Sequence, residues 1–215
     1  MKGLIGKKVG MTQLFEENGV VTPVTVLEAG PCVVVQRKTA AKDGYEAAQI
    51  GLVDPSAAKR ANRPQRGHHE KAEVPPTRLR REFRLEPESE IKAGDPVLVD
   101  IFEGVERVDI IGVSKGKGFQ GVMRRHGFGG GKATHGSMHH RAPGSIGMAA
   151  YPAKVLKGTR MPGQQGNRRV TVKNLTIVKI DSEKNLLMVR GAVPGCKGAT
   201  LVIRKSLSNK QAQDA

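Results

Sequence analysis

Short runs in which apolar and polar residues alternate dominate both ends of the chain, and this period of two predicts β-strands. The runs are rich in Val, Ile and Thr, and turn residues such as Gly30-Pro31 and Asp43-Gly44 separate them. They cover residues 3–15, 20–27, 31–37, 45–53, 97–102, 105–113, 170–180, 186–190 and 199–203. Strands this short and closely spaced are typical of an antiparallel barrel or sandwich, so the expected fold class is all-β.

The strand pattern stops first at residues 54–90, which are rich in Lys, Arg, Pro and Ala and hold few large apolar groups. Residues 57–61 could form a helical turn or two and residues 79–85 a short strand, which predicts a small α+β insertion on the surface. Four arginines gather near its end: Arg78, Arg80, Arg81 and Arg84. They could be a solvated face balanced by Glu82 and Glu86 or a contact to phosphate, and the pattern favours neither.

The pattern stops again at residues 112–173, where every charged side chain is basic. Between Asp109 and Asp181 there is no Asp or Glu, but there are thirteen Lys or Arg, fourteen Gly and four of the six His. A gap of that length is expected by chance on the order of one time in a thousand. The chain holds 36 basic and 20 acidic residues, so removing those thirteen leaves 23 against 20. Positive charge this concentrated needs a polyanion, most commonly nucleic acid.

These breaks divide the chain into one β body with two excursions and a tail. The body is expected from residues 1–53, 91–113 and 170–205, the insertion from 54–90, the basic loop from 114–169 and a flexible tail from 206–215. Because predicted strands flank the basic loop on both sides, its two ends are expected to be anchored close together.

Cysteine usage and hydropathy predict a protein of the cytoplasm. Cys32 and Cys196 are far apart and form no Cys-x-x-Cys pair, which favours free thiols in a reducing compartment. Lys2, Lys7 and Lys8 interrupt the first residues, so we expect no signal peptide. No window approaches the roughly 18 apolar residues of a membrane span, and no amphipathic face suits a membrane surface. We therefore expect no membrane partner.

Two nucleotide-binding motifs inside the basic loop fail at fixed positions. The G-x-G-x-x-G run that begins at Gly116 needs an acidic residue about 20 positions further on, and the segment has none. Gly131-Lys132 resembles the end of a P-loop, yet His126 replaces the first Gly and Ala133 replaces the Ser or Thr that would hold magnesium. We therefore expect no small-molecule substrate and no cofactor.

Four histidines of the loop offer a more serious alternative: His126, His135, His139 and His140. Four imidazoles within fifteen residues could hold a metal ion and make the protein a metal-assisted nucleic-acid hydrolase. No carboxylate or thiolate lies nearby to complete such a site or to orient a ligand. In a basic, Gly-rich loop, histidine more often stacks on bases or hydrogen-bonds to ribose and phosphate. No metal site is therefore expected, and the hydrolase is kept as the alternative function.

RNA binding accounts for more of the loop's residues than either alternative. Lys and Arg neutralise phosphates, and the glycines let main-chain N–H groups approach a crowded polyanion. Gly together with Pro143, Pro152 and Pro162 is expected to deny the segment a helix, and its few apolar residues deny it a core. The loop is therefore expected to order only when RNA supplies the counter-charge.

The motif that opens the loop resembles the signature of the L-three family of large-ribosomal-subunit proteins: Phe102, Asp109, Gly112, Ser114, Gly116-Lys117-Gly118, Gly121 and Arg125. The likeness continues through further segments that look like those of bacterial members: residues 2–12, 29–32, 143–147, 161–167 and 191–195. It thus runs essentially from one end of the chain to the other.

The resemblance implies a six-stranded β-barrel of the translation-protein type and a long loop that threads through large-subunit RNA toward the peptidyl transferase centre. It also implies direct binding near the 3′ end of that RNA, an early role in subunit assembly, and neighbouring large-subunit proteins as partners. Carried over by position, the loop tip is Met148, Ala149, Ala150 and Tyr151. Some bacterial relatives hold a methylated glutamine at the position of Ala150, where that modification cannot occur.

The RNA contacts are expected from basic and imidazole side chains at the start of the chain and along the loop. They are Lys2, Lys7, Lys8, Lys115, Lys117, Arg124, Arg125, His126, Lys132, His135, His139, His140, Arg141, Lys154, Lys157, Arg160, Arg168 and Arg169. No residue is expected to be catalytic or to hold a metal ion.

Overall fold

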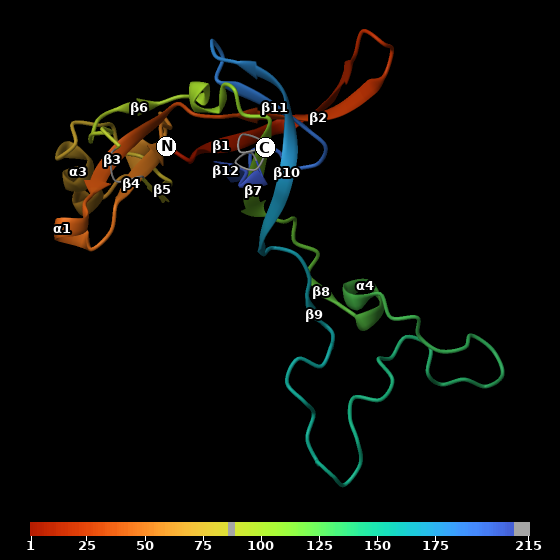
Figure 1. Ribbon diagram of the computed structural model, residues 1–215. Helices are drawn as coiled ribbons and strands as arrows, with labels where there is room; N and C mark the ends of the chain where they lie inside the picture. Colours follow the sequence, from red (N-terminus) through yellow and green to blue (C-terminus); the bar gives the residue numbers. More distant parts are fainter. Residues whose placement is uncertain (86–88, 209–215) are drawn as a thin grey trace. The chain divides into compact units, whose positions relative to one another are not determined.

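Six antiparallel strands form a closed ring in the computed structural model, which describes residues 1–85 and 89–208. Around the ring the order is β1-β12-β7-β10-β11-β2, and β2 pairs back with β1 (Figure 1). The strands are β1 (Gly3–Phe15), β2 (Val21–Glu28), β7 (Arg107–Val113), β10 (Arg169–Asp181), β11 (Leu186–Arg190) and β12 (Thr200–Lys205). The prediction of a mainly β fold is confirmed, and β10 and β11 pair as an antiparallel hairpin.

A second sheet has four strands in the order β5-β4-β3-β6: β3 (Cys32–Lys38), β4 (Ala47–Leu52), β5 (Arg80–Arg84) and β6 (Pro96–Val97). This arrangement corrects the division drawn from the sequence. Residues 1–53 were expected to lie in one β body, but β3 and β4 leave the ring and pair with β5 from the supposed insertion. The alternating pattern predicted the strands, but it carries no information about which strands pair.

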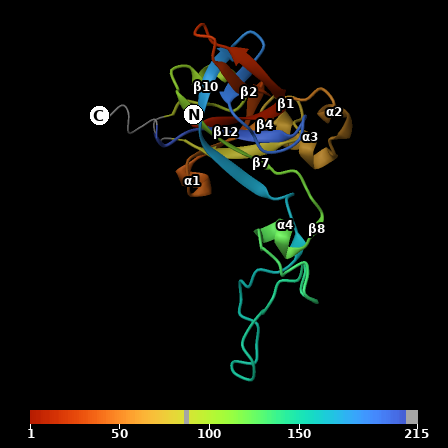
Figure 2. The ribbon, with the colours of Figure 1, turned by 90° about the vertical axis from the view of Figure 1, so that its right-hand side faces the viewer.

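Helices in the first unit are few and short among the described residues: α1 (Ala40–Asp43), α2 (Ala57–Arg60), α3 (Arg63–Glu70) and the 3₁₀ helix η1 (Val99–Phe102). Figure 2 shows α3 beside β4, where His68 of α3 bonds to Gln49 of β4 at 2.9 Å. The elements α2 and β5 confirm the helical turn and the strand predicted in the insertion. Sequence reasoning missed α3, although Asn62 and Gln65 form a capping box at its start.

The strand predicted at residues 97–102 is wrong, because most of that run folds as η1. Its two fully buried side chains, Val99 and Phe102, are three residues apart. In a 3₁₀ helix residues i and i+3 lie on the same side, so one short turn buries both. The run is apolar as predicted, but its buried side chains follow the period of three of a 3₁₀ helix and not the period of two of a strand.

One hydrophobic core extends across the ring and the second sheet. It includes Leu4 and Ile203 from the ring, Phe83 from β5, and Phe102 from η1, all nearly inaccessible to solvent. Gly3 lies at the junction, where an added Cβ would overlap the carbonyl oxygen of Ile203 and come within 2.8 Å of the Phe83 ring. The side of β1 that faces the second sheet therefore requires glycine at this position.

The chain folds as two units, residues 1–113 with 169–215 and residues 114–168. In the first unit Val113 of β7 pairs with Arg169 of β10, which confirms that the ends of the loop are held close together. Most of the predicted flexible tail, residues 206–215, lies outside the described residues. Its first residue, Ser206, is buried and its hydroxyl donates to the side chain of Asn174 at 2.5 Å.

Candidate nucleic-acid interface

The second unit begins and ends in a narrow two-stranded neck, residues 114–120 and 163–168. Main-chain bonds join its two sides: Ser114 N–H donates to Arg168 O at 2.9 Å, and Lys117 N–H donates to Gln165 O at 2.9 Å. Short strands β8 (Phe119–Gln120) and β9 (Gly163–Gln164) extend this ladder. The G-x-G-x-x-G run that begins at Gly116 thus starts in the neck, after the antiparallel strand β7, whereas a dinucleotide site needs a parallel βαβ unit.

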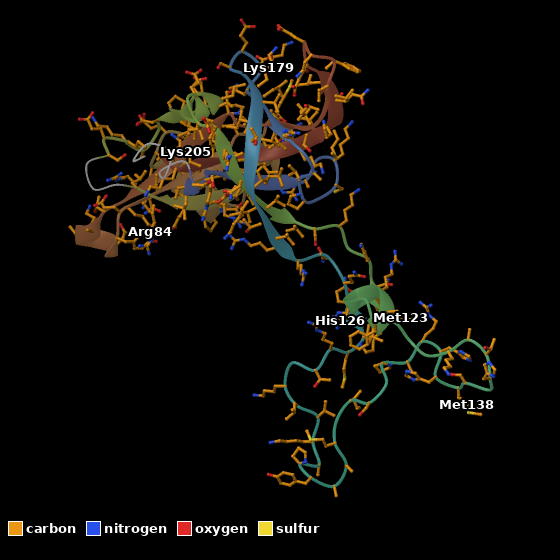
Figure 3. The ribbon with its side chains drawn as sticks, turned by 45° about the vertical axis from the view of Figure 1, so that its right-hand side comes forward. Arg84, Met123, His126, Met138, Lys179 and Lys205 are labelled. Carbon is orange, nitrogen blue, oxygen red and sulfur yellow. The ribbon has the colours of Figure 1, made fainter. Side chains whose placement is uncertain are left out.

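A short helix, α4 (Val122–His126), lies just beyond the neck and is tied to the returning chain. The Arg125 guanidinium donates to the Met161 carbonyl oxygen at 2.6 Å, and the His126 ring nitrogen Nε2 donates to the same oxygen at 3.0 Å. Figure 3 shows Met123 and His126 gathered beside this helix. The expectation that Gly and Pro exclude any helix from the loop is therefore wrong at α4. The three prolines of the loop all come after this helix in the chain.

The outer part of the loop contains a subloop, residues 131–140, that closes on itself. Gly131 N–H donates to His140 O at 3.2 Å, and the His140 ring nitrogen Nδ1 donates to Lys132 O at 3.0 Å. An added Cβ on Gly131 would overlap the His139 carbonyl oxygen. Glycine is required at this crossing because the two backbones approach so closely.

The basic side chains of the second unit point into solvent and have no acidic partner within it. Of its ten Lys and Arg residues only Arg125 is partly buried, and the unit has no Asp or Glu. The exposed members are Lys115, Lys117, Arg124, Lys132, Arg141, Lys154, Lys157, Arg160 and Arg168. A surface of this kind attracts a polyanion along its whole length.

Comparisons with known proteins identify the family of the chain. Residues 84–187 match the model of a family described as Ribosomal protein L3. The chain is 53% identical over 205 residues to the large ribosomal subunit protein uL3 of Solibacter usitatus, covering 95% of this chain and 98% of that protein. It is 54% identical over 214 residues to uL3 of Koribacter versatilis, covering 96% and 87% of the two chains. The chain belongs to the ribosomal protein L3 family.

A third relative extends the match across bacteria, since uL3 of Heliobacterium modesticaldum is 52% identical over 209 residues, covering 97% of this chain and 99% of that one. The family resemblance seen in the sequence is thus confirmed. Membership of the family does not fix the role of each side chain.

Three of the residues expected to contact RNA have other roles in the structure. The Lys8 ammonium is buried and donates to Val193 O at 2.7 Å and Gly195 O at 3.2 Å, so it holds the segment between β11 and β12. Arg125 and His126 bond to the loop's own backbone, as described above. Each of these three groups bonds to main-chain oxygens inside the protein, and their contacts to RNA stay predictions.

The remaining basic residues outside the loop differ in their surroundings. Lys7 is partly buried and lies 3.6 Å from the Asp54 carboxylate. Hydrogen bonds from Ser56 lower the pKa of Asp54, and the charge of Lys7 lowers it further. The side chains of Lys2 and Arg169 are exposed. That Lys2, Lys7 and Arg169 contact RNA stays a prediction.

The histidines of the loop are dispersed rather than gathered. The ring nitrogens of His126 and His140 bond to main-chain oxygens, and His135 and His139 are exposed. Across residues 1–85 and 89–208, no three His, Cys, Asp or Glu side chains are placed to hold a metal ion together. The hydrolase alternative therefore gains no support. Among the same residues, no helix is long and apolar enough to cross a membrane.

The segment that the resemblance places at the loop tip is exposed and uncharged. Met148 is 64% exposed and Tyr151 is 89% exposed, and no basic residue lies between Arg141 and Lys154. Ala149 and Ala150 are exposed as well. Contacts here would depend on shape and apolar packing rather than on phosphate neutralisation.

The arginine cluster of the second sheet makes mainly local contacts. Arg80 donates to Thr77 O at 3.1 Å, Arg81 donates to Arg80 O at 2.8 Å, and the Arg84 guanidinium lies 5.8 Å from the centre of the Tyr45 ring. Of the two carboxylates expected to balance the cluster, Glu86 lies outside the described residues. Glu82 bonds instead to Lys38 and Tyr45, and these bonds lower its pKa. A phosphate contact by this cluster stays an open alternative.

Proposed function

We propose that this chain is a structural constituent of the large ribosomal subunit and binds large-subunit RNA directly through residues 114–168. The observation that carries the proposal is the set of nine exposed Lys and Arg residues in a unit without any acid. The relatives that match nearly the whole chain are proteins of the large ribosomal subunit, so we infer that the polyanion is the RNA of that subunit. The protein itself is not expected to catalyse a reaction.

The geometry of the loop supports penetration into RNA rather than binding on a flat surface. Its neck is only two strands wide, and at Gly166 an added Cβ would overlap Lys115 O, so the two chains pass as closely as backbones can. Basic side chains project from the loop in Figure 3 and can neutralise phosphates on more than one side. A narrow, polycationic loop of this kind fits between packed RNA helices.

The finer parts of the proposal rest on the family resemblance. They are binding near the 3′ end of the RNA, an early role in assembly, a cytoplasmic ribosome as the location, and a loop tip at residues 148–151 directed toward the peptidyl transferase centre. The closed ring would be the family's six-stranded barrel. The uncharged, exposed tip is consistent with contacts that depend on shape.

The test compares two full-length variants that lose the same charge. In the loop variant Lys115, Lys117, Lys154 and Lys157 are replaced by Gln, and in the control variant Lys42, Lys59, Lys92 and Lys184, all exposed in the first unit, are replaced by Gln. Each lost phosphate contact lowers the slope of log K against log salt by about 0.7 to 0.9. We expect the slope for large-subunit RNA to fall by about 3 in the loop variant and little in the control. Equal slopes in the two variants would overturn the assignment.

The position of the tip has a separate test. A hydroxyl-radical source attached at Tyr151→Cys, in a chain with Cys196→Ser, should cleave RNA of the catalytic core in assembled subunits. Cleavage confined to other RNA regions would contradict the placement of the tip without affecting RNA binding by the loop.

A further inference from the structure

A stretch near the N-terminus has the opposite composition to the basic loop. Residues 9–36 contain no Lys or Arg, although the chain has 36 of them in 215 residues. For a given stretch of that length this is expected by chance on the order of one time in two hundred. The stretch contains three glutamates, Glu16, Glu17 and Glu28. In a protein that binds RNA, such a segment is unsuited to contact with phosphate.

Residues 9–27 of this stretch form the outer half of the β1–β2 hairpin, here called the distal hairpin. Within it Met11 pairs with Thr25 and Phe15 pairs with Val21, and residues directly opposite each other lie on the same face. Met11, Phe15 and Val21 are 53%, 71% and 48% exposed. The distal hairpin therefore presents a strip of large apolar side chains to solvent.

The same hairpin also has an unsatisfied edge. β1 pairs with β12 only through Lys7, with further main-chain bonds at Lys8, and then continues for seven residues to Phe15 beside β2 alone. Among the described residues no other strand pairs with this outer part of β1. Figure 1 shows the hairpin projecting beyond the other strands of the ring. An exposed strand edge offers main-chain donors and acceptors to an added strand.

We propose that the distal hairpin is a docking surface for an extended, basic and apolar segment of another protein of the subunit. The partner's apolar side chains would cover Met11, Phe15 and Val21, and its Lys or Arg residues would lie near Glu16 and Glu17. The negative charge of the hairpin tip disfavours RNA as the partner, because the tip bears two carboxylates and residues 9–36 contain no Lys or Arg. This inference rests on the proposed function, since the partner is met only in the assembled subunit.

The test places a photo-reactive benzoylphenylalanine at Phe15 in the full chain, which is then incorporated into large subunits. We expect a cross-link to a peptide of another protein that contains apolar residues and Lys or Arg. The control carries the same group at Val178, an exposed position of β10, and is expected not to give that cross-link. Failure of the chain to enter subunits would count against the proposed function. Entry with a cross-link to RNA, or with Phe15 still open to solvent, would overturn the docking surface alone.

Two substitutions test the chemistry of the contact, with the photo-reactive group moved to Met11. Phe15→Ser should lower the cross-link yield roughly tenfold, because the partner loses a large apolar contact. Glu17→Lys should lower it about threefold, whereas Glu183→Lys, in the exposed turn after β10, should leave it unchanged. A yield that increases with Glu17→Lys would show that the neighbour is acidic and would refute the proposal.

Discussion

The guanidinium of Arg125 donates to the main-chain oxygen of Met161 at 2.6 Å, across 36 positions of sequence. This bond joins helix α4 to the chain that returns to the neck, and it uses a side chain that the sequence had assigned to phosphate. The neighbouring Arg124 is exposed, and its guanidinium donates to the side-chain oxygen of Gln120 at 3.4 Å. Two adjacent arginines of the same helix therefore have different roles.

This difference predicts different salt dependences for two matched variants. Arg124→Gln should lower the slope of log K against log salt for large-subunit RNA by about 0.7 to 0.9, because one phosphate contact is lost. Arg125→Gln should weaken binding with little change in slope, since it loosens the loop without removing a contact to phosphate. Titrations at several salt concentrations with full-length protein measure both values. The same loss of slope in both variants would show that Arg125 also contacts RNA.

The crossing at Gly131 predicts a steric effect that a nearby glycine does not share. Gly131→Ala would place a Cβ against the carbonyl oxygen of His139, whereas a Cβ at Gly129 has no atom within 4 Å. We expect Gly131→Ala to reduce the free energy of RNA binding by about 1 to 3 kcal/mol, because the subloop must deform. Gly129→Ala should have little effect. Filter binding at one salt concentration compares them, and equal losses would contradict the closed subloop.

Much of the fold could be predicted from local pattern, and what could not depends on distant contacts. The strands of the ring follow from alternation and β-branched residues. The loop range predicted between the flanking strands, residues 114–169, differs from the second unit by one residue, whereas the acid-free gap itself is wider at both ends. The separate second sheet could not be seen, because the pairing of β3 with β4 and β5 is a choice between strands of similar pattern. The helix α3 was readable from its capping box at Asn62 and Gln65 but was overlooked.

The candidate site was predictable as a region but not residue by residue. Composition alone marks residues 114–168 as a polycation. It cannot distinguish Lys8 from Lys7, because the burial of Lys8 depends on the distant segment after β11, where its ammonium bonds to Val193 O and Gly195 O. Composition also cannot show that the His126 ring bonds to the main-chain oxygen of Met161, 35 positions away.

The two cysteines are predicted to react very differently with thiol reagents. Cys32 is inaccessible to solvent, its thiol donates to Ile5 O at 3.2 Å, and burial raises its pKa to about 11. Cys196 is exposed. At pH 8 only about one Cys32 in a thousand would be a thiolate, so a maleimide should add once to the native chain and twice to the unfolded chain. Mass spectrometry counts the additions, and two rapid additions to the native chain would contradict the buried position.

The raised pKa of Cys32 also predicts a pH dependence of stability. The native thiol keeps its proton up to about pH 11, whereas in the unfolded chain it loses the proton near its ordinary value of 9.0. The unfolded state therefore binds fewer protons between these values, and the contribution of Cys32 to stability is lost as the pH rises through them. Cys32→Ala should remove this part of the alkaline slope in urea unfolding, and Cys196→Ala serves as the control.

The buried ammonium of Lys8 predicts that substitutions at the adjacent Lys8 and Lys7 change the free energy of unfolding by different amounts. Lys8→Met keeps most of the side-chain volume but leaves the carbonyl oxygens of Val193 and Gly195 without this donor. We expect it to lower the free energy of unfolding by about 2 to 4 kcal/mol. Lys7→Met, which removes only a partly exposed ion pair with Asp54, should cost about 0 to 1 kcal/mol.

Urea unfolding of the RNA-free protein measures both changes. Below the unfolding transition, Lys8→Met should also bind large-subunit RNA with an unchanged salt slope, because the ammonium does not reach phosphate. Equal unfolding midpoints for the two variants would contradict the structural role of Lys8, and a slope lowered by Lys8→Met would show that Lys8 contacts RNA.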